Sequence, residues 1–332
     1  MSVRVGILGA GDMGRMHGDM LNKDPRVKIL GVADLDEKRA DLLAHQCGAK
    51  ALSTLDQLLE LGLDAVYVTS PNWTHLEAVT KSLAAGLHVF SEKPMATSLA
   101  DARLVMEAVE RSGKIYQLGF NRRFAPVYQF CRERVEAGFE PMVVNIRMNE
   151  GEMTNRPWIT DRARTGGYLN ENTIHFMDML RWLVGEPTEV FALGEANCYA
   201  DQVDFVVAFK FAGGRMASIT TSGHATWFYP WERMELVGDH EAIATEEVLR
   251  VMHAPGVAKP AIWYDYFQVT KPAQWGYEGG DRAFVSAVLG ECPSAFPASE
   301  GFKAMTLVEA CYESIRTGQK VVLENRDSRI EH

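Results

Sequence analysis

The sequence predicts an α/β protein with two domains, the first built on a parallel sheet and the second on a mainly antiparallel one. Its 332 residues exceed what a single typical core holds. Up to about residue 120, nearly continuous apolar runs alternate with helical patterns, which is typical of a parallel sheet covered on both faces. Beyond residue 121, strands of alternating polarity follow one another and indicate an α+β domain. We therefore expect domains at residues 1–121 and 122–332.

The elements of the first domain follow from the spacing of apolar residues. Short apolar runs predict strands at Val3–Leu8, Val27–Ala33, Ala65–Thr69, His88–Phe90 and Ile115–Leu118. Apolar residues three and four positions apart predict helices at Met13–Leu21, Glu37–His45, Leu55–Leu61, Leu76–Ala85 and Leu99–Arg111. Ser98, followed three residues later by Asp101, resembles a capping box that would open the last of these helices.

In the second domain, two helical patterns come before a series of strands. We expect the first helix at Ala125–Ala137, a strand at Met142–Met148, and a second helix that begins within residues 166–180. Alternating patterns predict the later strands Glu189–Tyr199, Val203–Phe211, Arg215–Ser222 and Arg233–Gly238, and then the helices Gly280–Leu289 and Ser299–Thr317. Gly213-Gly214 predicts a hairpin turn of two residues.

Composition and charge argue against several classes of protein. The net charge is −10 and the basic residues form no cluster, which argues against a nucleic-acid partner. No apolar run reaches the ~18 residues that predict a membrane span. The N-terminal stretch leads directly into a strand, without the features of a signal peptide. The five cysteines have no metal-ligand spacing, so we expect reduced thiols, no metal and a cytoplasmic location.

A dinucleotide-binding motif lies between the first strand and the first helix. Gly9-Ala10-Gly11-Asp12-Met13-Gly14 is a GxGxxG, whose glycines permit a tight turn and close approach to a pyrophosphate at the positive end of a helix. Asp34, 20 residues after Gly14, would accept hydrogen bonds from the adenine ribose and repel a 2′-phosphate. A solvated strand end is the alternative for Asp34. We expect NAD as cofactor, with NADP as the alternative because Arg39 is close enough in sequence to neutralise a phosphate.

Two further stretches follow predicted strands, at the edge of a parallel sheet where such folds bind ligands. Ser70-Pro71-Asn72 follows the third strand, and His75, in the next helical turn, is included with them without a chemical role. Ser91-Glu92-Lys93-Pro94 follows the fourth strand. The proline disfavours helix at Lys93, so the lysine would point towards the ligand. The alternative is a solvated lysine at a turn.

A line of polar residues interrupts the second helix of the second domain. Glu171, His175 and Asp178 are four and three residues apart, which would place them on one helix face. Apolar residues surround this line, including Ile174 and Phe176. A solvated helix face is the alternative explanation.

Four motifs in order make the chain resemble a known family. They are the GxGxxG, Glu92-Lys93-Pro94, Asn121-Arg122-Arg123-Phe124, and a glycine-rich lead into a D/E-x-x-x-H-x-x-D helix. The resemblance is to the glucose–fructose oxidoreductase, inositol dehydrogenase and MocA family, over essentially the whole chain. It implies an N-terminal Rossmann domain and a C-terminal α/β domain whose large open sheet often forms the subunit interface. It also implies NAD(P)-dependent oxidation or reduction, mostly of sugars and cyclitols, by a homodimer or homotetramer.

The resemblance also implies roles for single residues. Lys93 takes the place of the family's active-site lysine, His175 that of its catalytic histidine, and Glu92 would lie beside the nicotinamide. Glu171 stands where members usually have aspartate. In this hypothesis His175 is the general acid/base, and Asp178, one turn further on, fixes the tautomer and orientation of its ring. Lys93 stabilises the alkoxide, and Glu171 holds a substrate hydroxyl.

The candidate site residues are therefore of three kinds. The catalytic candidates are Lys93, His175 and Glu171. The substrate-binding candidates are Lys93, Trp158, Glu171, Asn172 and His175. The cofactor-binding candidates are Gly9, Ala10, Gly11, Asp12, Met13, Gly14, Asp34, Arg39, Ser70, Pro71, Asn72, His75, Glu92, Lys93 and Asn121.

The leading hypothesis is a dehydrogenase acting on a CH–OH group of a sugar or cyclitol. Two alternatives share the fold: a sensor that binds NAD(P) without turnover, and a glycosidase that uses bound NAD transiently. An uncharged or weakly acidic polyol is expected as the substrate. A sugar phosphate is the rival if Arg122, Arg123 or Arg164 points into the site.

Overall fold

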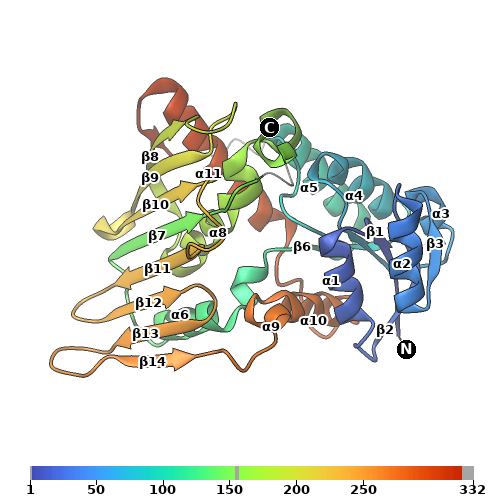
Figure 1. Cartoon of the computed structure of the whole chain (residues 1–332), viewed down its shortest axis with the longest axis horizontal. Helices are drawn as coiled ribbons and strands as arrows, with labels where there is room; N and C mark the ends of the chain where they lie inside the picture. Colours follow the sequence, from blue (N-terminus) through green and yellow to red (C-terminus); the bar gives the residue numbers. More distant parts are fainter. Residues whose placement is uncertain (1, 154–156, 324–332) are drawn as a thin grey trace. The chain divides into compact units, whose positions relative to one another are not determined.

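The computed structural model describes residues 2–153 and 157–323, and the chain divides into two compact units (Figure 1). Unit 1 contains the chain up to Asn121 together with Gly276–Lys303. Unit 2 contains Arg122–Trp275 and the chain from Ala304 on. The expected second domain, 122–332, is therefore wrong for residues 276–303, which belong to the first unit.

Unit 1 is built on a parallel sheet in the order β3-β2-β1-β4-β5-β6. Its strands are β1 (Val3–Leu8), β2 (Val27–Ala33), β3 (Lys50–Leu52), β4 (Ala65–Val68), β5 (His88–Ser91) and β6 (Tyr116–Leu118). Every pairing is parallel. The strand order reverses between β1 and β4, and ligands of doubly wound folds bind beyond the carboxyl ends at such a point. The predicted Rossmann architecture is confirmed, although β3 had no apolar run long enough to predict it.

The helices of unit 1 begin close to the predicted positions. They are α1 (Asp12–Leu21), α2 (Glu37–Cys47), α3 (Leu55–Leu59), η1 (Asn72–Thr74), α4 (His75–Ala84), α5 (Leu99–Ser112) and α10 (Tyr277–Val288). Ser98 caps α5 by accepting a hydrogen bond from the backbone N–H of Asp101, as the capping pattern predicts. Asp36 caps α2 in the same way.

Aromatic packing explains why α10 belongs to unit 1. Phe284 of α10 is fully buried and contacts both Tyr67 of β4 and Phe90 of β5 at ring-centroid distances of 5.3 and 5.7 Å. Tyr67 and Phe90 stack on each other at 4.6 Å. Val285 joins the same core. The apolar face of α10 therefore completes a core that the first 121 residues leave open, and local sequence patterns do not reveal such a distant contact.

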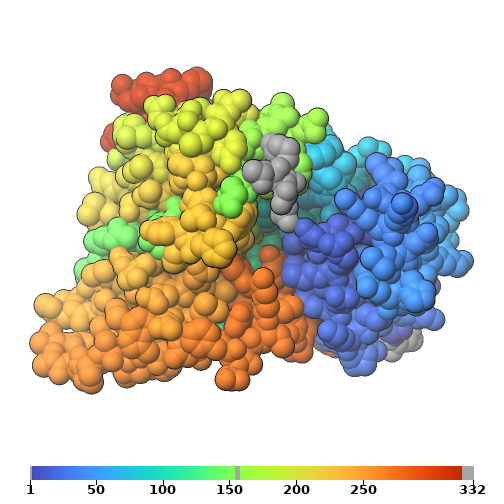
Figure 2. Space-filling model, viewed as in Figure 1, coloured from blue at the N-terminus to red at the C-terminus, as the bar shows by residue number. Residues whose placement is uncertain are grey.

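Unit 2 is built on a sheet in the order β14-β13-β12-β11-β7-β10-β9-β8-β15. Its strands are β7 (Val143–Asn149), β8 (Pro187–Glu195), β9 (Asp204–Phe211), β10 (Met216–Ser222), β11 (Glu232–Val237), β12 (Ala242–Glu246), β13 (Arg250–Ala254), β14 (Ile262–Asp265) and β15 (Val321–Val322). Only β7 and β10 pair in parallel, so the predicted mainly antiparallel sheet is confirmed. The sequence did not predict β12 to β14. β14 is the last strand in this order and its four residues are exposed, so its orange segment lies at the surface in Figure 2.

The helices of unit 2 lie on one face of its sheet (Figure 1). They are α6 (Pro126–Glu136), α8 (Ile174–Val184) and α11 (Ala298–Thr317), the last of which begins in unit 1; the short α7 (Arg162–Thr165) and α9 (Lys271–Gln274) accompany them. Along β9, Phe205, Val207 and Phe209 are buried, whereas the alternate residues are exposed. The period of two thus separates a helix-covered face from an open one.

The hairpin between β9 and β10 differs from prediction in its loop length. Gly213 and Gly214 both have positive φ, as expected, but Ala212 joins them in a three-residue turn. The N–H of Phe211 donates to the carbonyl of Arg215 across this turn. Across both units, no helix within the described ranges combines the length and the apolar character that spanning a bilayer requires.

Candidate active site

The turn from β1 into α1 depends on its glycines. Gly9 has φ +98°, and a Cβ there would lie 2.6 Å from the backbone nitrogen of Ser70. A Cβ on Gly14 would overlap the carbonyl oxygen of Gly9. A Cβ on Gly11 would contact nothing within 4 Å, so this side of the turn has room for a ligand. These are the roles that the glycines of a dinucleotide-binding turn perform: a tight turn, close ligand approach and close packing of helix on strand.

The first turn of α1 can receive a pyrophosphate. Its N-cap is Gly11, which has no side chain to accept hydrogen bonds from the first N–H groups of the helix. Such groups, together with the helix dipole, bind phosphate oxygens. The hydroxyl of Thr69 lies 2.8 Å from the carbonyl oxygen of Gly9 and fixes the turn to the end of β4. The residues present therefore fit an NAD pyrophosphate.

Asp34 lies at the end of β2 and joins two loops. Its Oδ2 accepts from the N–H of Ala10 at 2.6 Å, and its Oδ1 accepts from the N–H of Asp36 at 2.8 Å. The carboxylate is half-buried beside the glycine turn. Arg39 is exposed, and its Nε lies 3.4 Å from a carboxylate oxygen of Asp36. An acid therefore lies beside the glycine turn, and the exposed arginine has an acidic partner. The contact of Asp34 with the adenine ribose stays a prediction.

His75 links the loops that follow β4 and β5. Its Nε2 lies 2.9 Å from the carbonyl oxygen of Ser70, and its Nδ1 lies 2.8 Å from that of Pro94. Both ring nitrogens are therefore engaged within unit 1, and a cofactor contact of His75 would have to come from its carbons or its backbone. Ser70 also shares a hydrogen bond with the hydroxyl of Thr74 at 2.7 Å.

Glu92 and Lys93 follow β5 at the carboxyl edge of the same sheet. Glu92 is buried, and its Oε2 accepts from the backbone N–H of Lys93 at 3.2 Å. Lys93 is half-buried and precedes a cis peptide bond to Pro94. A Cβ on Gly119 would lie 3.0 Å from the Glu92 carboxylate, so this glycine leaves space for it. Asn121 is buried nearby in the chain and donates its N–H to the carbonyl of Gly119.

The sequence reasoning missed a histidine that contacts Glu92. His17 of α1 is 1% exposed, with its Nε2 3.0 Å from Glu92 Oε1 and its Nδ1 2.8 Å from Asp281 Oδ1. Burial opposes the charged imidazole, but the charge of Asp281 and the hydrogen bonds to both carboxylates outweigh it and raise the pKa of His17 to about 10. Burial raises the pKa of Asp281, against the effect of His17. The sequence held one signal for His17: it is a polar residue on the same face of α1 as the buried Gly14 and Leu21.

In unit 2, the predicted helix begins with a π-helical turn. Glu171 lies in η4 (Leu169–Thr173), which is π-helical, whereas His175 and Asp178 lie in α8. A π turn closes hydrogen bonds five residues apart, so the segment that joins Glu171 to His175 is not the continuous α-helix that was expected, and the alignment of their side chains stays a prediction. His175 and Asp178 keep the predicted spacing of three on one α-helical face. The hydroxyl of Tyr312 lies where a Cβ on Gly167 would be, and this hydroxyl accepts from the N–H of Leu169.

The carboxylate of Asp178 holds an arginine. Both of its oxygens accept from Arg123, with a distance of 2.9 Å to Nε, and Asp178 is fully buried. The predicted role of Asp178 in orienting the ring of His175 stays a prediction. His175 itself is buried in the first turn of α8.

A second buried ion pair lies one residue away in the chain. Arg122 donates through Nε and Nη2 to one oxygen of Glu232 at 3.0 and 2.6 Å, and the hydroxyl of Tyr128 donates to the other oxygen at 2.6 Å. The guanidinium also lies over the rings of Phe176 and Trp275. Because they are paired and hydrogen-bonded in this way, both charges can be buried beside Phe176 of α8.

Asn172 is engaged with two neighbouring residues. Its side-chain N–H groups donate to the carboxylate of Glu150 and to the hydroxyl of Tyr168. The predicted contact of Asn172 with the substrate would therefore be made by its side-chain carbonyl oxygen. Glu150 lies just after β7, and no sequence motif marked it. Tyr168 in turn donates to the carbonyl of Ser222 at 3.0 Å.

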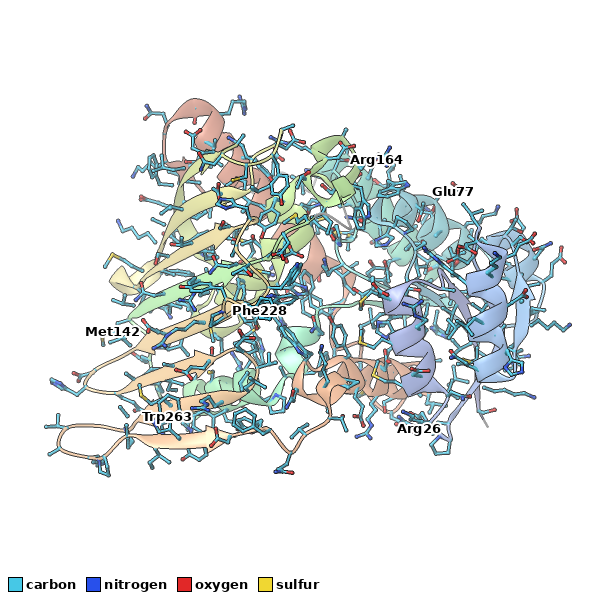
Figure 3. All side chains as sticks on the ribbon, viewed as in Figure 1. Arg26, Glu77, Met142, Arg164, Phe228 and Trp263 are labelled. Atoms are coloured by element: carbon cyan, nitrogen blue, oxygen red, sulfur yellow. The ribbon has the colours of Figure 1, made fainter. Side chains whose placement is uncertain are left out.

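The aromatic candidates separate into packed and exposed groups. Trp158 is half-buried in η3 (Pro157–Thr160). Trp231 contacts Trp227 and Trp275 at ring-centroid distances of 5.1 and 5.7 Å. Phe228, labelled in Figure 3, is 97% exposed on the connection between β10 and β11. Trp227, Trp231 and Trp275 therefore pack on one another, whereas Phe228 is open to solvent.

Comparisons with known proteins agree with this arrangement. Residues 3–120 match the family model described as "Oxidoreductase family, NAD-binding Rossmann fold", and residues 128–244 match the GFO/IDH/MocA C-terminal domain. An inositol 2-dehydrogenase of Rubrobacter xylanophilus is 31% identical over 96% of this chain and 93% of its own length. An inositol 2-dehydrogenase of Rhizobium meliloti is 27% identical over 97% of this chain and 99% of its own.

Solved structures share the whole fold. A myo-inositol dehydrogenase from Corynebacterium glutamicum has a TM-score of 0.82 at 25% identity, covering 98% of this chain and 99% of its own. GenD2 of gentamicin A biosynthesis, solved in complex with NAD, has the same TM-score and identity and covers 97% of each chain. The similarity therefore extends across both units.

The position of Asp34 predicts cofactor preference. Wild-type protein should bind NAD more tightly than NADP. Asp34→Asn removes the negative charge, but its side-chain oxygen can still accept from the N–H of Ala10. The ratio of the NADP to the NAD dissociation constant should therefore fall by about tenfold, or about 1.4 kcal/mol. Asp34→Ser should narrow it as well. Fluorescence titration with NADH and NADPH measures both constants.

The control for Asp34 is Asp41→Asn, which neutralises an exposed acid further along α2 and leaves the pair between Asp36 and Arg39 in place. Its NADH-to-NADPH ratio should stay close to that of the wild type. A wild-type preference for NADPH would contradict the assignment of Asp34.

Proposed function

The chain belongs to the glucose–fructose oxidoreductase, inositol dehydrogenase and MocA family of NAD-binding oxidoreductases, and from that premise we propose that it is a polyol dehydrogenase. In this proposal a hydride passes between the nicotinamide and a secondary alcohol or ketone of a sugar or cyclitol. The observation that carries the proposal is the position of Lys93, at the carboxyl edge that also holds the glycine turn. Homologues named as inositol dehydrogenases support a cyclitol substrate.

The proposed chemistry divides between three side chains. When bound, NAD supplies the hydride acceptor. His175 takes the proton of the substrate hydroxyl as general base, since an imidazole is suited to proton transfer near neutral pH. Lys93 stabilises the negative charge that develops on the same oxygen. Glu171 accepts a hydrogen bond from a neighbouring hydroxyl and so selects a polyol. The dehydrogenase names of the relatives favour net hydride transfer over the sensor and the glycosidase.

The partners of the arginines support a neutral substrate. Arg122 pairs with Glu232, Arg123 with Asp178, and Arg164 with Asp161 at 3.2 Å. Breaking the two buried pairs to receive a phosphate would leave a carboxylate buried with its main cation removed, which is costly. A neutral polyol requires no such change.

Two wider features complete the proposal. All five cysteines are free thiols, which supports a reducing compartment such as the cytoplasm. The open face of the unit 2 sheet carries apolar side chains that include Leu193, Val206 and Met216, each more than half exposed. An apolar sheet face of this kind supports a homodimer or homotetramer formed through it.

Removing either catalytic group should slow turnover without preventing cofactor binding. In the wild type, a screen of sugars and inositols should detect NADH formation with at least one polyol. Lys93→Met and His175→Ala should each reduce kcat by about 10²–10⁴-fold, the usual contribution of a group that transfers or stabilises a proton. NADH affinity should change little, because neither substitution alters the glycine turn.

The matched controls are Lys38→Met and His224→Ala. Lys38 is exposed on α2, and His224 is paired with Asp204 at the surface of unit 2. Both variants should retain wild-type kcat. Near-normal turnover in Lys93→Met or His175→Ala would show that the wrong residue has been assigned.

Free polyols should be better substrates than their phosphates. Since the three arginines are paired with acids, kcat/KM for inositols and free sugars should exceed that for the corresponding monophosphates at equal concentration. The comparison uses NADH absorbance with matched pairs of compounds. Turnover confined to the phosphorylated compounds would mean that the arginines leave their carboxylates to bind phosphate.

The open sheet face predicts the effect of one charge on assembly. Val206 on β9 lies beside Leu193 of β8 and Thr220 of β10. Val206→Asp would bury a charge in the proposed interface and should convert the assembly to monomers in sedimentation velocity. Leu104→Asp, at an exposed position on α5, is the control and should leave assembly unchanged. A wild-type protein that is monomeric at micromolar concentration would refute the interface.

A further inference from the structure

Three elements of unit 1 meet at a buried histidine. His17 comes from α1, Glu92 follows β5, and Asp281 comes from α10. The ring nitrogens of His17 lie 3.0 and 2.8 Å from one oxygen of each carboxylate, and all three side chains are buried. A polar cluster in a core that also contains Phe90 and Phe284 would be costly unless its charges were balanced.

We propose that His17 is a positioning residue for the reaction: its imidazolium, held between two carboxylates, fixes Glu92 and through Glu92 the backbone of Lys93. The proposal deepens the proposed function, because it rests on Lys93 as the group beside the substrate oxygen. It adds a residue of the first helix to the machinery and gives Glu92 a supporting contact in addition to its expected place beside the nicotinamide.

The charge of the ring follows from its two partners. A neutral imidazole has one N–H and can donate to only one acceptor, so its other nitrogen would face a carboxylate oxygen lone pair. An imidazolium donates to both carboxylates and neutralises one of them. Three aromatic rings also lie against the imidazole, those of Tyr67 from β4, Phe90 from β5 and Tyr277 from α10, and of these only the tyrosines can titrate. The pKa of His17, raised to about 10, agrees with a ring that stays charged at neutral pH.

The link to Lys93 runs through the second oxygen of Glu92. One oxygen receives His17, and the other accepts the backbone N–H of Lys93 at 3.2 Å. α1 begins at the glycine turn and carries His17, so one helix connects the proposed pyrophosphate site to Glu92. Because Lys93 follows Glu92 directly, a change in that carboxylate displaces the lysine. Displacements of about 1 Å at a reacting centre cost roughly 10²-fold in rate.

The test compares three variants of the full-length protein. His17→Gln removes the charge but can still donate to Glu92. His17→Gln with Asp281→Asn removes the charges of both groups, lets Gln donate to Glu92 and accept from Asn, and leaves Glu92 as the remaining charge of the cluster. His253→Gln is the control, since His253 is also buried and lies 2.6 Å from a carboxylate oxygen of Glu241 in unit 2. All three are measured for kcat and KM on the best polyol, for NADH affinity, and for the free energy of unfolding.

We expect kcat to fall by about 10²-fold in His17→Gln, with a smaller change in KM. The double variant should recover stability but not kcat, and His253→Gln should keep wild-type kcat. Full recovery of kcat in the double variant would overturn the requirement for charge. A folded His17→Gln protein with kcat within twofold of wild type would overturn the positioning role.

Two measurements do not depend on finding a substrate. Nitrogen-15 NMR should show both ring nitrogens of His17 protonated from pH 6 to 9; a neutral tautomer at pH 7 would refute the imidazolium. Since the folded pKa lies above the unfolded value of 6.5, the native state binds the extra proton between the two. Wild-type stability should therefore contain a contribution that is present below pH 6.5 and lost as pH rises towards 10, and His17→Gln should lack that slope. If no polyol reacts with wild-type protein, the proposed function fails while these two results still report on His17.

Discussion

The close approach of the turn after β1 to the turn after β4 is the contact on which the cofactor site depends. Gly9 lies against the backbone of Ser70, where any side chain would overlap it, and the hydroxyl of Thr69 completes the contact. Because the strand order reverses between these two strands, their carboxyl ends form one edge. β5 is the next strand, so Lys93 reaches the same edge. Lys93, the proposed catalytic lysine, therefore lies at the same sheet edge as the glycine turn.

Charge is buried in both units in balanced groups. In unit 2, Arg122 pairs with Glu232, and Arg123 pairs with Asp178 of α8. In unit 1, His17 lies between two carboxylates. An isolated charge in such places would destabilise the fold, whereas paired groups keep defined positions. The same pairing engages Arg122 and Arg123 with acids, and this is the observation behind the proposal of an uncharged substrate.

Local patterns predicted those parts of the structure that local physics determines. Apolar runs located β1 and β2 at their observed bounds, and the glycine motif located the first turn. The packing of Phe284 against Tyr67 could not be read from the sequence, because it joins residues far apart in the chain. The π turn at Glu171 was missed because its spacing matches an α-helix equally well. His17 was missed because a buried histidine is recognisable only when its partners are known.

The proposed function requires direct transfer of a hydrogen from the substrate to the cofactor. The most direct measurement uses myo-inositol, or the best polyol from the screen, with deuterium on every ring carbon, and follows the NADH by mass spectrometry and proton NMR. Hydride transfer from the polyol should place one deuterium at C4 of the nicotinamide for each ketone formed, with none lost to water. NADH that carries no deuterium, or NAD that stays oxidised while product accumulates, would contradict a dehydrogenase and point to a different use of the bound nucleotide.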